Sequence, residues 1–308
     1  MTDRAPTIVG VGNALVDHTF FLTNLPQADG GAFVLDYERR FGGVETNVVT
    51  LTAALGHDGG VVSRVGSDEE GDAVIDHLDA YDIDATHVTQ AAGETTSYTL
   101  VLTDPDGQRA IVGGGDTILN LVLDDAATAY VADADIAFSS AYAPVSAVET
   151  VAELDVPLVY DLAGRFQDLE HRGLTRDALD ALLPDIDCLI ANEAAARSFT
   201  QVDADRHDLA AGLRARGCPR GAVTAGADGA VLFDADGTYH SPAIDVDPVD
   251  TTGAGDAFTA GLIHAWLLGD ADPREAGRFA TATAAATCLV EGAHTDPPTL
   301  ADVEAILE

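Results

Sequence analysis

The sequence predicts an α/β protein with a mostly parallel, doubly wound sheet and a small inserted β-sheet that acts as a lid. Short buried runs at 135–138, 156–160 and 186–190 alternate with helical stretches, as expected of a parallel sheet covered on both faces. Strand-like segments at 32–41 and 96–112 interrupt this alternation. The 308 residues can bury a large core, and a hydrophobic content of 47% excludes a disordered chain.

The first expected strand covers residues 7–12 and delivers Asn13 and Asp17 to its carboxyl end. Ligands collect at this end of the strands in open α/β sheets. Amide and carboxylate groups bind hydroxyls well. Asn13 and Asp17 are therefore candidate substrate-binding residues.

Gly10-x-Gly12 could also begin a dinucleotide-binding fingerprint. Leu15 stands where the third glycine is required, and Pro26 interrupts the helix that should follow. An NAD-dependent oxidoreductase is thus an alternative that rests on this glycine pair alone.

The segment 32–41 looks extended, and residues 96–103 and 108–112 read as two strands around a turn that contains proline and glycine. These strands do not fit the surrounding alternation. We therefore expect a separate sheet, inserted at about 18–41 and 95–114, that could close over a site as a lid.

Gly42 and Gly43 precede a helix that should end at Leu55, before Gly56. A glycine pair permits close approach of a ligand to the backbone. Asn47 would lie about one turn into the helix, facing the same space. Gly43 and Asn47 are therefore further candidates for binding a hydroxyl compound, although two glycines before a helix often form only a turn.

The later expected strands are followed by polar residues, among them Arg165, Asn192 and Thr224. Because parallel strands end at one edge of a sheet, these residues should meet the segment 250–256 there. They are candidates for contacting a nucleotide. The bland alternative is that loops are polar because they are exposed.

The segment 250–256, Asp-Thr-Thr-Gly-Ala-Gly-Asp, leads into an apolar-periodic run at 258–268 that predicts a helix stopped at Gly269. Small residues at a helix start let an anion reach unpaired N–H groups, where the helix dipole also favours negative charge. Asp256 lies in the same turn and could accept a proton from a bound group. Alternatively, Asp256 and Thr252 merely cap the helix.

The formal net charge is −37, and all 15 basic residues are arginine. Acids spread among well-patterned elements indicate the solvated surface of a folded protein adapted to high internal salt. No basic cluster matches the phosphates of a nucleic acid, so we expect no nucleic-acid partner. Without lysine there can be no GxxxxGK[ST] loop, and a nucleotide must be held in another way.

No apolar run approaches the length of a membrane span, and residues 1–4 lead directly into the first strand without a signal-peptide stretch. We expect a cytoplasmic protein with no membrane partner. Cys188, Cys218 and Cys288 are odd in number and far apart, which favours reduced thiols over a disulfide framework. The histidines lack metal-binding spacing, and no GxSxG elbow occurs.

Together the motifs at 12–17, 42–47, 224–229 and 250–256 resemble the ribokinase-like, or PfkB, family of carbohydrate kinases. The resemblance covers nearly the whole chain, and the last motif is the most specific. It implies a ribokinase-like α/β sandwich with a lid that closes over a sugar. It also implies ATP-dependent phosphorylation of a primary hydroxyl of a small sugar or sugar-like substrate.

Carried over residue by residue, the resemblance makes Asp256 the general base and the N–H groups of the residues before it an anion hole. It implies a homodimer through the lid, with ATP, Mg²⁺ and, in many members, a monovalent cation such as K⁺. The implied sites are catalytic Asp256, Gly253, Ala254, Gly255 and Arg165; substrate-binding Asn13, Asp17, Gly43 and Asn47; nucleotide-binding Asn192, Thr224, Gly226 and Gly229; and cation-binding Asp250 and Thr252.

One departure from the family concerns the pattern Asn-x-x-Glu, where this chain has Asn192 followed by Ala195. Metal use could be altered, or Glu193 could act from the neighbouring position. The missing glutamate keeps open a catalytically inactive sugar-binding homologue, which the intact base and anion hole disfavour. Among substrates, ribose, fructose, 2-keto-3-deoxygluconate and nucleosides stay open. Arg39, Arg40 and Arg109 also keep a sugar phosphate open.

Overall fold

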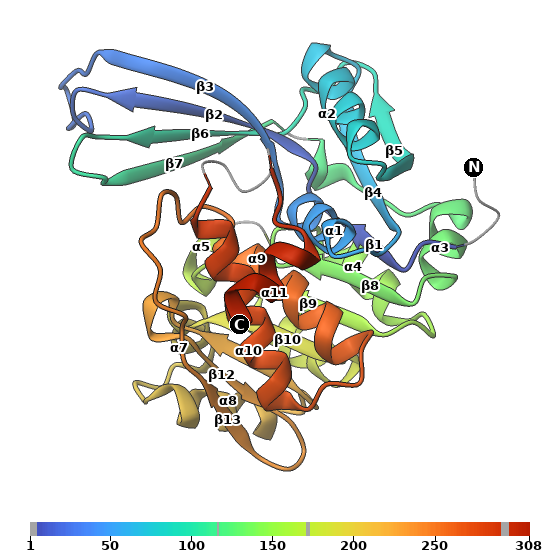
Figure 1. Ribbon diagram of the computed structural model, residues 1–308. Coiled ribbons are helices and arrows are strands. Elements are labelled where there is room, and N and C mark those ends of the chain that lie inside the picture. Colours follow the sequence, from blue (N-terminus) through green and yellow to red (C-terminus); the bar gives the residue numbers. More distant parts are fainter. Residues whose placement is uncertain (1–4, 116, 171–172, 291–295) are drawn as a thin grey trace.

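The computed structural model describes residues 5–115, 117–170, 173–290 and 296–308. The first four residues, which entered the expectation of no signal peptide, lie outside these ranges. The described chain forms one large and one small sheet (Figure 1). The large sheet has the order β13 (Thr238–Ser241), β12 (Ala230–Phe233), β11 (Gly221–Thr224), β10 (Cys188–Asn192), β9 (Leu158–Asp161), β8 (Ile136–Ser140), β1 (Ile8–Val11), β4 (Gly59–Gly66) and β5 (Asp84–Ala91).

Helices cover both faces of the large sheet (Figure 1). One face carries α1 (Val44–Ala54), α2 (Glu69–Ala80), α9 (Ala254–Leu262) and α10 (Pro273–Cys288), with α11 (Leu300–Leu307) packed on α10. The other carries α3 (Asp125–Ala132), α4 (Val145–Ala152), α5 (Phe166–Glu170), α6 (Arg176–Leu182), α7 (Glu193–Thr200) and α8 (Arg206–Ala215). Shorter turns are η1 (Ile118–Asn120), η2 (Leu183–Asp185), η3 (Gly226–Asp228) and η4 (Ile263–Leu267).

The strands of the large sheet are buried on both sides. In β10, Cys188 and Ile190 belong to the core beneath α1 and α9, whereas Leu189 and Ala191 belong to the core on the other face. Successive side chains of a strand point to opposite faces, so both sets must be apolar. This confirms the prediction of a doubly wound sheet from continuous apolar runs.

The smaller sheet has the order β3 (Val34–Gly42), β2 (Leu15–Leu22), β6 (Tyr98–Thr103) and β7 (Arg109–Gly114). It projects from the large sheet as a separate layer (Figure 1); we call it the lid sheet. The chain enters it directly after β1, so Asp17 lies within a lid strand. A strand also stands where the dinucleotide-binding fingerprint requires a helix, which makes the oxidoreductase alternative wrong.

Some elements were not predicted. The strands β5 and β13 form the two edges of the large sheet, and β12, between β11 and β13, runs antiparallel to both neighbours. The helix expected to stop at Gly269 is formed by α9, which widens into the π-helical turn η4, where the Leu268 N–H donates to the Ile263 carbonyl at 3.0 Å. Short edge strands have weak sequence patterns because one side has no neighbour to select residues.

The topology marks one place at the sheet edge for ligands. β1 pairs with β4 on one side and with β8 on the other, and the chain builds the sheet outward in both directions from this point. Where strand order reverses in this way, a crevice opens beyond the carboxyl ends of the strands. Asn13, after β1, and Ser140, at the end of β8, therefore flank the expected ligand crevice.

The other sequence expectations concern thiols, metals and membranes. All three cysteines are free thiols, with Cys188 and Cys218 buried and Cys288 half-buried. Within the described ranges no helix is long and apolar enough to cross a bilayer, and no three His, Cys, Asp or Glu side chains gather as a metal site.

The acidic surface leads to a first prediction about stability. We expect the melting temperature to rise steeply between about 0.1 M and about 3 M KCl, because the Debye length falls to roughly 3 Å at 1 M and screens acid–acid repulsion. Differential scanning calorimetry measures this, with an uncharged osmolyte at matched osmolality as control. A melting temperature independent of KCl would contradict the prediction.

Candidate active site

The N terminus of α9 has the features of an anion-binding helix start. Its N-cap residue Gly253 has the left-handed φ of 76°, and no side chain caps the helix. The N–H of Gly255 has no backbone acceptor among the described residues. By contrast, the Asn192 side chain caps α7. The alternative that Asp256 and Thr252 cap α9 is therefore wrong, and free N–H groups remain at the positive end of the helix.

The Asp256 side chain points to α1 instead of to its own helix. Asn47 Nδ2 donates to Asp256 Oδ2 at 2.7 Å. Burial raises the pKa of Asp256 to about 8; the Asn47 hydrogen bond opposes this rise, and the charges of Asp161, Glu45 and Asp17 add to it. A carboxylate with a pKa near neutrality suits general-base chemistry.

The residues expected to bind a hydroxyl compound meet beside Asp256. Asn13 and Asn47 are buried, and the Asn47 N–H donates to the Gly43 carbonyl at 2.9 Å. Gly43 has φ 110°, and a Cβ at this position would stand 2.3 Å from the Asn13 carbonyl oxygen. Glycine is therefore required for α1 to start this close to the end of β1.

Asp17 reaches the site from the lid sheet. It lies opposite Arg40 on β3 and Thr99 on β6, and the Thr99 hydroxyl donates to its carboxylate. Burial raises the pKa of Asp17, whereas Thr99, His18 and Arg40 oppose the rise. An acceptor bound between Asp17 and Asn47 would therefore contact both the lid and the large domain.

A cavity of about 640 Å³ opens at the N terminus of α9, and Asn13, Asp17 and Asn47 do not line it. Thr224, Gly226 and Gly229 line it, as do Ala254 and Gly255 from the start of α9. The remaining walls are mostly small or apolar, including Ala243, Ile244, Val246, Phe258, Ala284 and Ala285. A nucleotide in this cavity would have its phosphates at the helix terminus.

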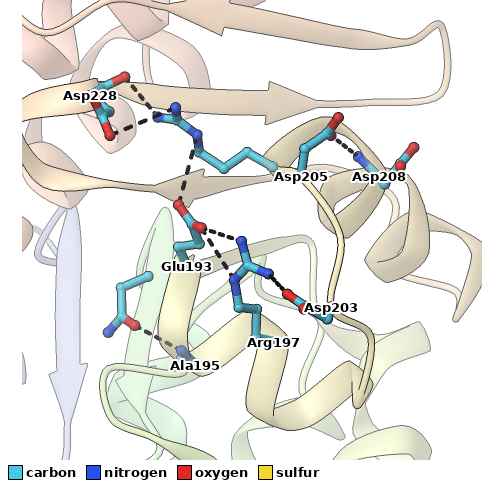
Figure 2. Close-up of polar contacts among 9 residues, drawn as sticks. Glu193, Ala195, Arg197, Asp203, Asp205, Asp208 and Asp228 are labelled. Carbon is cyan, nitrogen blue, oxygen red and sulfur yellow. Dashed lines mark hydrogen bonds and ion pairs between the residues drawn. The ribbon is translucent and has the colours of Figure 1, made fainter.

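Asn192 does not line this cavity. Its Oδ1 accepts from the Ala195 N–H at 2.8 Å, and its Nδ2 donates to the Ala163 carbonyl at 2.8 Å. Glu193 faces arginines, with Arg197 Nη2 2.5 Å from its carboxylate and Arg206 Nε 3.8 Å away (Figure 2). To bind a metal in place of the missing glutamate, Glu193 would have to leave both partners.

Arg206 also reaches the loop at the cavity edge, donating to the Asp228 carbonyl at 2.8 Å (Figure 2). The ion pairs of Glu193 therefore connect the starts of α7 and α8 with the turn η3 that carries Gly226. Exposed pairs of this kind contribute little individually. They hold this glycine loop against α8 as a network.

Three other predicted residues lie at the margin of the site. Arg165 is exposed at the start of α5. Asp250 accepts from Arg40 Nη1 at 3.2 Å and from the Thr252 N–H at 2.9 Å, and the Thr252 hydroxyl accepts from Arg109 Nη1 at 3.3 Å. Lid arginines thus contact the two positions expected to bind a monovalent cation.

Two carboxylates of the site were not predicted. Asp161, at the end of β9, has its pKa raised to about 7 by burial, with the Ala163 N–H opposing and Glu45 adding to the rise. Glu45 lies in the first turn of α1 and is fully buried. The only sequence signal for Glu45 was a charged residue at the start of an otherwise uncharged helix.

Comparisons with known proteins agree with this geometry. The model of the pfkB family of carbohydrate kinases matches residues 5–300. An ATP-dependent ribose-1-phosphate kinase from Halopiger xanaduensis is 30% identical over 296 residues, covering 94% of each chain. The structure of Arabidopsis thaliana ribokinase complexed with ribose and ATP superposes with a TM-score of 0.85 at 25% identity and covers 99% of each chain.

A Thermotoga maritima ribokinase structure gives the same TM-score of 0.85 at 23% identity, covering 98% of this chain and 99% of the other. The likeness extends over both sheets and both helical layers, so the fold is ribokinase-like. The chain therefore belongs to the pfkB family of carbohydrate kinases, whose members are ATP-dependent kinases.

Proposed function

We propose that the protein transfers the terminal phosphoryl group of ATP to a primary hydroxyl of a small sugar or sugar-like compound, with Asp256 as general base. One observation carries this proposal: Asp256 lies in the first turn of a helix without a side-chain cap, between the cavity of about 640 Å³ and the hydroxyl-binding residues. Phosphoryl transfer needs this arrangement of base, acceptor and anion seat.

Each residue then has a defined part. Asn47 holds Oδ2 of Asp256, and Oδ1 takes the proton of the acceptor hydroxyl as it attacks the phosphorus in line. The N–H groups of Gly253 and Gly255 stabilise the charge on the transferring phosphoryl group, and the Ala254 N–H, which donates to the Thr251 carbonyl at 3.3 Å, would have to turn from that carbonyl to join them. Arg165, at the start of α5, would add positive charge on closure. The lid excludes water, which otherwise competes as acceptor.

Mg²⁺ would arrive with the nucleotide. Ala195 offers no ligand, and Glu193 is paired with arginines. Mg²⁺ often keeps several waters and binds mainly to substrate phosphates, so a kinase site does not need a preformed cage. When bound, it would neutralise phosphate charge.

For K⁺ the residues fit poorly. The Asp250 carboxylate already accepts from Arg40 and Thr252. The proposed phosphoryl transfer therefore uses no monovalent cation.

A sugar phosphate is the second candidate acceptor, and the lid arginines favour it. Alternate residues of a strand share a face, so the register places Arg40 and Arg109 on the face of Asp17, and Arg39 on the opposite face. Three arginines balance three acids across the four lid strands, in a chain of net charge −37. A nucleoside is a further candidate acceptor, because Asp17 and Asn47 could each bind a hydroxyl of its ribose.

These faces give a second prediction. We expect Arg40→Ala and Arg109→Ala each to raise KM for ribose 1-phosphate by about tenfold to hundredfold, because each removes a charge-assisted contact. Arg39→Ala is the matched control and should leave that KM within about twofold. Steady-state kinetics with ribose 1-phosphate and with ribose measures the two KM values. An equal rise in KM for both acceptors would show that the arginines do not bind the phosphate.

The direct test of the proposed function follows ADP release from ATP with Mg²⁺ in molar KCl. The acceptor panel contains ribose, ribose 1-phosphate, fructose, 2-keto-3-deoxygluconate and a nucleoside. We expect acceptor-dependent ADP release with one of them. ADP release with none, from protein that binds sugar by calorimetry, would favour the inactive homologue.

We also propose that two copies pair through their lid sheets. Large apolar side chains are exposed on or beside the two edge strands β3 and β7, namely Phe33, Val34, Leu35, Tyr37, Ile111 and Val112. Exposed apolar edges favour pairing with another chain. Light scattering should give about twice the 31.8 kDa of one chain, and a single-chain mass at working concentration would contradict the dimer.

A further inference from the structure

Glu45 is a charged residue with no place in the proposed chemistry, yet it lies at the centre of the site. It is 0% exposed, in the first turn of α1. Its Oε2 accepts from the Asn13 N–H at 2.9 Å, and its Oε1 accepts from the N–H and the hydroxyl of Ser140 at 2.8 and 2.6 Å. A buried carboxylate is costly unless it is held in this way.

The hydrogen bonds define its protonation state. The Ser140 Oγ accepts from the Tyr142 N–H at 3.2 Å, so its own proton points to Glu45. Backbone N–H groups can only donate. Every contact of both oxygens is thus with a donor, which an ionised carboxylate requires. Burial raises the pKa of Glu45, and these donors oppose the rise.

The two glycines of Gly10-x-Gly12 make room for this side chain. A Cβ on Gly12 would stand 2.4 Å from the Glu45 carboxyl carbon and from Oε1. A Cβ on Gly10 would stand 2.9 Å from Val49 and 3.2 Å from the Glu45 carbonyl oxygen. The glycine pattern at the end of β1 is therefore explained by the approach of α1, without a dinucleotide.

Glu45 joins the two strands between which the ligand crevice opens. Asn13 follows β1, and Ser140 ends β8, the neighbours at which strand order reverses. The Thr46 hydroxyl adds a bond to the Asn13 carbonyl at 2.9 Å. Both backbone polar groups of Asn13 are thereby held by the first turn of α1, which fixes where its side chain can point.

The charge of Glu45 also acts on the groups around it. These groups are Tyr160 and Asp161 of β9 and Asp256 of α9, and burial is the largest cause of the raised pKa of each. The negative charge of Glu45 raises the pKa of Tyr160, Asp161 and Asp256. Asp256 and Asp161 therefore ionise at higher pH while Glu45 is ionised.

We infer that Glu45 is a positioning residue: its ionised carboxylate fixes Asn13 for acceptor binding and places a negative charge beside the proposed general base. This inference rests on the proposed kinase reaction. It differs from a purely structural role because it predicts effects on the acceptor and on proton transfer, and none on the nucleotide.

The test uses the 308-residue chain with the acceptor that gives the fastest ADP release in the panel proposed above. We expect Glu45→Gln to raise the acceptor KM by about tenfold and leave the ATP KM within about twofold. Without the charge, Asp256 ionises more easily, so the acidic limb of the kcat/KM profile should move to lower pH by about half a unit or more. Glu45→Asp keeps the charge but not the reach, and should raise the acceptor KM without moving the limb.

Glu69→Gln is the control, because it removes an exposed first-turn acid from α2. An unchanged acceptor KM and an unmoved acidic limb in folded Glu45→Gln would overturn the inference. If that variant does not fold, Ser140→Ala removes one donor and should raise the acceptor KM severalfold; no rise would overturn the inference equally. A wild-type protein without any ADP release would instead refute the proposed function.

Discussion

Asp256→Asn is expected to lower kcat by roughly 10²- to 10⁴-fold, because an amide cannot take the proton of the acceptor hydroxyl. The ATP affinity should stay within about twofold, since the helix terminus that receives the phosphates is unchanged. Steady-state kinetics of ADP release and calorimetry with ATP measure the two effects. Asp125→Asn is the matched control, because it also lies in the first turn of a helix but is exposed. A kcat within about threefold of the wild type would exclude Asp256 as the base.

The pH dependence of the wild-type protein tests the ionisation of Asp256. The kcat/KM of the wild type should rise with pH to a plateau, with an acidic limb near the Asp256 pKa of about 8. Asp161, with a pKa of about 7, is coupled to it, so the limb reports the pair. A limb near pH 4, the ordinary range of an aspartate, would contradict the environment described for this carboxylate.

Stability supplies an independent readout of this ionisation. The folded pKa of about 8 exceeds the unfolded value of 3.8, so over this range the folded state holds a proton that the unfolded state has lost. The contribution of Asp256 to stability therefore falls as pH rises from about 4 to about 8. Asp256→Asn should flatten the decline of melting temperature over this window and melt above the wild type at its upper end.

Gly43→Ala should produce the second large effect, a loss of both stability and acceptor binding. At φ 110° an L-residue is strained, and the new Cβ would lie 2.3 Å from the Asn13 carbonyl oxygen, which is backbone and cannot yield cheaply. We expect a loss of about 3 kcal/mol or more in the free energy of unfolding, since the left-handed conformation alone costs about 1–2 kcal/mol. The acceptor KM should rise in any protein that folds, because Asn13 must shift.

Gly56→Ala isolates the strain from the clash. Gly56 follows the other end of the same helix at φ 99°, and a Cβ there meets nothing within 4 Å. This control should lose only about 1–2 kcal/mol and keep its acceptor KM. Urea denaturation of both variants gives the comparison. Equal losses would show that the approach of Gly43 to Asn13 has no special importance.

The sequence predicted the architecture because each residue of a buried strand must be apolar, and this requirement is visible along the chain. A parallel strand covered on both faces needs apolar residues at successive positions, and residues 188–191, Cys-Leu-Ile-Ala, show this directly. The helix start without a side-chain cap was equally local, since small residues there expose N–H groups whatever lies around them. The strands β12 and β13 escaped prediction because they have four residues each, and β5 escaped it because its apolar residues recur at every third position instead of every second.

Tertiary structure decided which polar residues act together. Asp256 and Asn47 are 209 positions apart, and only the packing of α9 beside α1 brings their side chains to 2.7 Å. The same packing buries Asp161 and Glu45 near Asp256 and raises the pKa of Asp256, an effect of environment that no residue type carries by itself.

The sequence by itself determined a doubly wound sheet, an inserted second sheet and a helix start of small residues before Asp256, because each depends on neighbours along the chain. Only the tertiary structure showed that Asn192 also donates to the Ala163 carbonyl and that Arg40 and Arg109 lie on the lid-sheet face of Asp17. It also explained why residue 12 is glycine, because a Cβ there would lie 2.4 Å from the carboxyl carbon of Glu45. Such contacts join segments distant in sequence, so local pattern holds no record of them.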